Sequence, residues 1–93
     1  MKWLEIIELR AAVNIGHDLI NRLIVDALEE MPNVNQIVVY INGRVETDWS
    51  IHLKHESVTV DALGSKVGRQ LKEILREFGL VNHTVWINKE MSN

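Results

Sequence analysis

The stretch that most constrains the fold lies in the middle of the chain, from Gln36 to Glu56, and reads QIVVYINGRVETDWSIHLKHE. Two runs rich in β-branched and aromatic residues, Gln36–Ile41 and Asp48–His55, flank a polar connection, which predicts a β-hairpin. One face of the second run carries Trp49, Ile51 and Leu53, and the other carries Asp48, Ser50, His52 and Lys54. We therefore expect this strand to have one buried face and one polar face.

The connection between the two runs allows two registers. Asn42-Gly43 is a strong signal for a two-residue turn, which would place Tyr40 opposite Val45. That register puts Val38, Tyr40, Trp49 and Ile51 on one face of the hairpin. A longer loop through Thr47-Asp48 is the alternative and would reverse the matching of the faces. The choice decides whether Tyr40 or Val39 is the neighbour of His52.

Helical periodicity precedes the hairpin. Apolar residues recur there at spacings of three and four, and Pro32 is expected to end the helix. The stripe consists of Leu19, Ile20, Leu23, Ile24, Ala27, Leu28 and Met31.

A second helix is predicted after the hairpin, with Asp61 or Ser65 as its cap. Gly64 and Gly68 would let this helix approach a neighbouring element closely. Gly79 is expected to adopt a left-handed conformation after the helix, with Leu80 folded back onto the last turn. The apolar stripe consists of Leu63, Val67, Leu71, Ile74, Leu75 and Phe78.

Two further strands are predicted, at Trp3–Arg10 and Asn82–Lys89. In the first, Glu5 and Glu8 point to opposite faces, so the pattern does not identify its buried face. The resulting β-α-β-β-α-β order predicts one α+β domain over residues 1–93, a ferredoxin-like sandwich with antiparallel sheet order 4-1-3-2. Both helices would cover one face of the sheet, and the other face needs a partner sheet, a ligand or a polar coat.

Composition excludes several classes of protein. A net charge of −3 argues against a general nucleic-acid binder. The absence of cysteine excludes disulfides and thiolate metal sites and is compatible with the cytoplasm, where we expect the protein. The opening MKWLEIIELRAAV is too short and too charged for a signal peptide or a membrane span. Chains of 93 residues bury only about 60–65% of the surface that their unfolded state exposes and are often oligomeric, so we expect a homodimer.

His52 is the strongest candidate among the four histidines. It lies in mid-strand on the polar face, where it would act either as a general base or ligand donor, or as a hydrogen-bonded interface residue. His55 points to the opposite face, and no histidine spacing suits a metal, so no metal site is expected. Trp86 shares a face with Thr84, where it would meet a ligand or a dimer mate. We take Trp86, Ser50 and Tyr40 as candidate ligand-binding residues.

The element order, the stretch TDWSIHLKHE and the stretch FGLVNHTVWI resemble a small uncharacterised prokaryotic family within the dimeric α+β barrel superfamily, of the antibiotic-biosynthesis-monooxygenase type. The resemblance implies a dimer that pairs two open sheet faces into a barrel, with a small ligand between sheet and helices. Some members of that superfamily are cofactor-independent oxygenases. Many oxygenases of this type carry a histidine in the second helix, and LGSKVGRQLKEIL has none, which counts against that activity here.

Two functions follow as hypotheses. The first is a homodimeric binding or structural module that holds a small ligand without a cofactor. The second is a cofactor-independent enzyme acting on a small aromatic or carbonyl compound, with His52 as the proton acceptor. Binding of a regulatory effector fits the same fold.

Overall fold

The computed structural model describes residues 1–30 and 34–89 and shows an α+β fold. The elements follow the β-α-β-β-α-β order that the sequence predicts. They are β1 (Lys2–Ala11), α1 (His17–Glu30), β2 (Val34–Ile41), β3 (Asp48–Glu56), α2 (Lys66–Leu75) and β4 (Gly79–Ile87).

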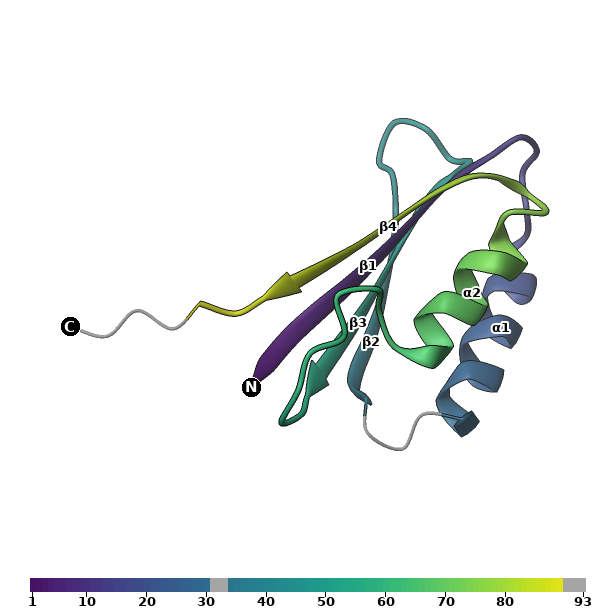
Figure 1. The fold of residues 1–93 in the computed structure, drawn as a ribbon. Helices are drawn as coiled ribbons and strands as arrows, with labels where there is room; N and C mark the ends of the chain where they lie inside the picture. Colours follow the sequence, from purple (N-terminus) through teal and green to yellow (C-terminus); the bar gives the residue numbers. More distant parts are fainter. Residues whose placement is uncertain (31–33, 90–93) are drawn as a thin grey trace.

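The four strands form one open antiparallel sheet, and both helices lie on one side of it (Figure 1). From one edge to the other the strand order is β2-β3-β1-β4, so β3 and β1 are central. The same sheet counted from the β4 edge reads 4-1-3-2. The element order and this sheet fit a ferredoxin-like arrangement.

Strands β2 and β3 are joined by the longer loop, which is one of the two connections that the sequence allows, and not by a two-residue turn at Asn42-Gly43. Tyr40 pairs with Ser50 and Val38 pairs with His52. Within the loop, the side-chain oxygen of Asn42 accepts hydrogen bonds from two backbone amides, those of Arg44 and Val45. The longer loop aligns the apolar rows of the two strands on the helix side, and that burial outweighs the local turn preference.

The core lies between the sheet and the helices. Trp49, Ile51 and Leu53 are buried there, as the hairpin pattern predicted. From β1 the same face carries Trp3, Glu5, Ile7 and Leu9, all buried, which identifies the inward face that the sequence left open. The helices complete the core with Ile20, Ala27, Val67, Leu71 and Leu75.

Several details of the helices differ from the predictions. Ser65 caps α2, and Leu63 precedes the helix and is 72% exposed, so Leu63 does not belong to the apolar stripe. Gly79 begins β4 without a left-handed conformation, and Leu80 is 76% exposed on β4 instead of packing on the helix. The predicted roles of Met31 and Pro32 lie outside the described residues.

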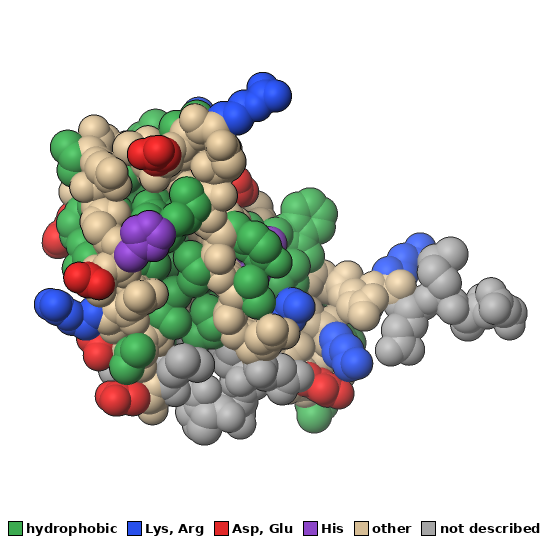
Figure 2. Space-filling view, turned by 180° about the vertical axis from the view of Figure 1, so that it is seen from behind, with side chains coloured by type: hydrophobic (Ala, Val, Ile, Leu, Met, Phe, Trp, Pro, Cys, Tyr) green, Lys and Arg blue, Asp and Glu red, His purple; other side chains and the backbone are tan. Residues whose placement is uncertain are grey.

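The sheet face opposite the helices is here called the open face. It carries the even-numbered residues of β1, β3 and β4 and, from β2, Gln36, Val38 and Tyr40, because paired residues of neighbouring antiparallel strands point to the same side. Figure 2 shows the molecule from behind the view of Figure 1, with the sheet again nearly edge-on, and hydrophobic side chains gather in the middle of that view with charged ones around them. Tyr40 is 52% exposed and Trp86 is 58% exposed on the open face.

Candidate functional site

Three of the predicted site residues lie together on the open face. His52 is half-buried in the middle of β3, and its Nε2 lies 3.0 Å from the hydroxyl oxygen of Ser50. The ring of Tyr40, from β2, lies 4.8 Å from the imidazole of His52 between centroids. The long hairpin loop therefore makes Tyr40, and not Val39, the neighbour of His52.

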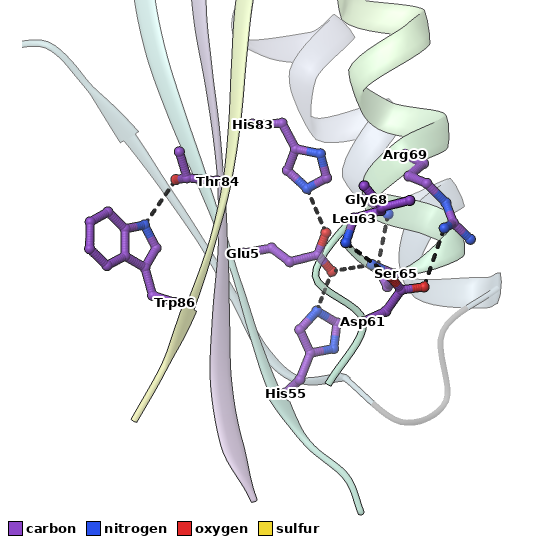
Figure 3. A network of polar contacts seen from close by, with 10 residues as sticks. All are labelled: Glu5, His55, Asp61, Leu63, Ser65, Gly68, Arg69, His83, Thr84 and Trp86. Atoms are coloured by element: carbon purple, nitrogen blue, oxygen red, sulfur yellow. Dashed lines mark hydrogen bonds and ion pairs between the residues drawn. The ribbon is translucent and has the colours of Figure 1, made fainter. Parts of the chain in front are cut away.

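Trp86 does not join this cluster within one chain. It lies on the edge strand β4, where it pairs with Leu4, and the central strand β1 separates it from β3. Its indole N–H donates to the hydroxyl of Thr84 at 2.9 Å, on the side of the sheet away from the helices (Figure 3). The predicted site residues of the hairpin therefore lie together, and Trp86 lies apart from them on the edge strand.

The open face carries a cavity at each end. One, of about 420 Å³, is lined by Tyr40 and Ser50 together with Glu8, Arg10, Asp48 and Asn82. The other, of about 500 Å³, is lined by Leu4, Lys54 and Trp86 among others. The row that contains Val38, His52, Ile6 and Thr84 runs between the two. Volumes of this size suit small organic ligands.

A second polar cluster lies on the helix side of the sheet and is centred on Glu5 (Figure 3). Nε2 of His55 lies 2.6 Å from Oε1 of Glu5, and Nε2 of His83 lies 2.8 Å from Oε2. The backbone amide of Ser65 donates to Oε1 at 3.0 Å. The three side chains are at most 7% exposed, so the cluster is enclosed.

The local sequence explains why helix α2 meets this carboxylate. Ser65 caps the helix by accepting from the amide of Gly68 at 3.0 Å, which leaves the Ser65 amide directed at Glu5. Gly64 has φ +93 and lies against His83, and Gly68 lies against Glu5. A Cβ at Gly68 would overlap Oε2 of Glu5, so only glycine permits the approach. The predicted close approach of the helix is confirmed at Gly68, whereas Gly64 precedes the helix and meets the cluster from the loop.

Electrostatics keep Glu5 ionised. Burial alone raises the pKa of Glu5, but hydrogen bonds from His55, Ser65 and His83 outweigh burial and lower the pKa from 4.5 to about 2. An ionised carboxylate only accepts hydrogen bonds, so Nε2 is the protonated nitrogen in both histidines. The negative charge also lies at the amino end of α2, where the helix dipole favours it.

Trp3 closes the Glu5 cluster from the side. Its ring stacks on that of His55 with centroids 4.0 Å apart and planes at 18°. Its indole N–H donates to the hydroxyl of Ser57 at 2.8 Å. The cluster thus ties β1, β3, β4 and α2 together, and its enclosed carboxylate suits a structural role better than catalysis.

The sequence did not predict this cluster. Glu5 and Glu8 point to opposite faces of their strand, and no histidine spacing suits a metal. The available signal was Glu5 itself, which is in phase with Trp3, Ile7 and Leu9 on the buried face of β1. A carboxylate on the buried face of a strand requires hydrogen-bond donors, and the sequence does not indicate which histidines supply them.

No group of three acidic, histidine or cysteine side chains within the described ranges is arranged to hold a metal ion. Of the helices in the part of the chain that the structure describes, neither has the length and hydrophobicity to cross a bilayer. Comparisons with known protein families, with curated proteins and with solved structures find no match to this chain.

Proposed function

We propose that this chain is a small ligand-binding module that works as a homodimer, with the open faces of two sheets turned toward each other. The observation that carries the proposal is the cluster of Tyr40, Ser50 and His52 beside a cavity of about 420 Å³ on an uncovered sheet face. Helices cover the opposite face, so a single chain leaves this one to solvent or to a partner.

The apolar content of the open face supports a partner. Leu4, Ile6 and Val38 are only half-buried, and Tyr40 and Trp86 are exposed. Contiguous exposed apolar surface of this kind marks interaction sites in proteins. A second copy is the simplest cover, because identical subunits associate most often through a two-fold axis.

The ligand belongs on the open face under this proposal. The space between sheet and helices, where the resemblance places a ligand, holds core side chains such as Ile7, Ile51 and Leu71. The phenol ring of Tyr40 and the imidazole of His52 offer aromatic surface, and the hydroxyl of Ser50 offers a hydrogen bond. A small aromatic compound with one or two polar groups fits these donors and acceptors.

An enzyme is the alternative, and the contact between His52 and Ser50 favours it. A hydroxyl 3.0 Å from Nε2 orients the imidazole, and a half-buried histidine near neutral pH can accept a proton from a bound aromatic or carbonyl substrate. No cofactor is needed for that step.

The test begins with the mass of the wild-type particle, measured by size-exclusion chromatography with light scattering. A thermal-shift screen of small aromatic compounds then identifies a ligand for titration. We expect His52→Ala to weaken binding of that ligand about 5- to 30-fold, since a stacked, hydrogen-bonded group contributes about 1–2 kcal/mol, while the dimer persists. His17→Ala removes an exposed histidine outside the open face and should leave the affinity unchanged.

A wild-type monomer at tens of micromolar would contradict the proposed dimer, and unchanged affinity in His52→Ala would contradict the proposed site. Turnover of the same compounds, lost in His52→Ala, would favour the enzyme.

A further inference from the structure

Opposite charges face each other across the two central strands at both ends of the open face. At one end Arg10 is the register partner of Asp48, with Nε and Oδ2 3.9 Å apart. At the other end Lys2 is the register partner of Glu56. At both ends of the face, therefore, the positive charge lies on β1 and the negative charge lies on β3.

Two identical sheets can pair through these faces in two simple ways. If the two-fold axis runs along the strands, β3 of one copy lies over β1 of the other, and each end of one sheet meets the same end of its partner. If the axis runs across the strands, β1 lies over β1 and β3 over β3, and the ends are exchanged. In the aligned class of sheet packing the strands of the two sheets stay within about 30° of parallel, and within that class these two arrangements are distinct.

The charges differ between the two arrangements. With the axis along the strands, Arg10 lies over the partner's Asp48 and Lys2 lies over the partner's Glu56. Each end then carries two cations and two anions in alternation. With the axis across the strands, Arg10 lies over the partner's Lys2 and Asp48 over the partner's Glu56, which places like charges face to face. Like-charge juxtaposition disfavours an interface, and complementary charge fixes its register.

We propose that the second copy packs on the open face with the two-fold axis parallel to the strands, held in register by the Arg10/Asp48 and Lys2/Glu56 pairs of both copies. This inference rests on the proposed homodimer and specifies its orientation. It also places the two cavities lined by Tyr40 and Ser50 at the same end of the dimer, facing each other across the axis. The ligand site is then shared by both copies and is incomplete in one.

Charge reversal tests the orientation. Arg10→Asp gathers four carboxylates at one end of the dimer and should raise the dimer dissociation constant at least about tenfold at low salt. The double variant Arg10→Asp/Asp48→Arg restores alternation between the copies and should return the constant to the wild-type value. Arg22→Asp makes the same charge change on α1, away from the open face, and should leave the constant unchanged. Sedimentation equilibrium measures all four proteins.

A thiol cross-linking experiment gives an independent answer, since the chain has no cysteine of its own. Val38 and Thr84 lie in the same row on opposite edge strands, about 14 Å apart at three strand spacings. With the axis along the strands, Val38 of one copy faces the partner's Thr84 across about 10 Å. A 1:1 mixture of Val38→Cys and Thr84→Cys, refolded together, should therefore cross-link with a short bis-maleimide, whereas each variant alone should not.

The outcomes separate the two proposals. A wild-type monomer overturns both. Three results would overturn the orientation but leave the homodimer in place. The first is a dimer that is not weakened by Arg10→Asp, and the second is a dimer that becomes tighter in the double charge swap. The third is cross-linking of the Val38→Cys variant to itself and of the Thr84→Cys variant to itself. Circular dichroism of each variant confirms that it is folded before the association is measured.

Discussion

Replacing Glu5 with alanine is expected to lower the free energy of unfolding by about 3–5 kcal/mol, the range observed when one partner of a buried ion pair is removed. The change leaves three buried donors without their acceptor: Nε2 of His55, Nε2 of His83 and the amide of Ser65. Since small domains have a total stability of about 5–15 kcal/mol, this loss is a large share of it. Urea denaturation followed by tryptophan fluorescence measures the effect.

Glu29 provides a control, because it is exposed on α1 and its replacement with alanine should change stability by less than about 0.5 kcal/mol. A loss below about 1 kcal/mol in Glu5→Ala would show that the cluster does not hold the fold together.

The same carboxylate should give the protein a distinct dependence on pH. Its pKa is depressed from 4.5 to about 2 on folding, so its stabilising contribution is fully present above about pH 5 and is lost as the pH falls through the folded value. A depression of that size corresponds to about 3 kcal/mol. The stability difference between wild type and Glu5→Gln should therefore shrink by about that amount between pH 6 and pH 2. A difference that is independent of pH over this range would contradict the depressed pKa.

Gly68→Ala should have opposite effects in two backgrounds. In the wild type the added methyl group overlaps Oε2 of Glu5. Three hydrogen bonds to the two carboxylate oxygens hold this side chain in place, so we expect a net loss of about 2 kcal/mol. In Glu5→Ala the obstructing atoms are gone, and the helix preference of alanine over glycine should stabilise the protein by about 1 kcal/mol. The four proteins form a double-mutant cycle, measured by urea denaturation, with a coupling of about 3 kcal/mol.

Gly64→Ala is the matched control for this cycle. Gly64 lies against the same cluster but has φ +93, which strains any residue with a Cβ. Its substitution should remain destabilising in both backgrounds. If Gly68→Ala costs the same with and without Glu5, the close approach of helix and carboxylate is not what selects glycine there.

The hairpin shows where local sequence signals and burial compete. Alternation placed Trp49, Ile51 and Leu53 on the buried face and His52 on the open one, and both are observed. The turn was not predicted, because Asn42-Gly43 favours a two-residue turn locally while the apolar rows of β2 and β3 align on one face only with a longer loop. Register is decided by the sum of buried contacts, which a short motif does not contain.

The two candidate sites also differ in how far the sequence predicts them. Neighbours within the hairpin, such as Ser50 and His52, follow from alternation and proximity in the chain. The partners of Glu5 do not, because His55, Ser65 and His83 are separated from it by 50, 60 and 78 positions. Their convergence depends on the strand order and on the register of two strand pairs together. Sequence periodicity reports the face of each residue and leaves its long-range partners undetermined.

The central position of β1 has a consequence for the chain during synthesis. Both neighbours of β1 follow it in the sequence, β3 from Asp48 and β4 from Gly79, so the ribosome releases β1 long before its partners exist. In that interval the run WLEIIEL is an unpaired apolar strand, the type of segment that seeds aggregation. Glu5 and Glu8 place a charge on each of its faces and act as gatekeepers. We therefore expect the charge of Glu5 to oppose aggregation of the nascent strand, and the same charge is later enclosed by two histidines and the start of α2.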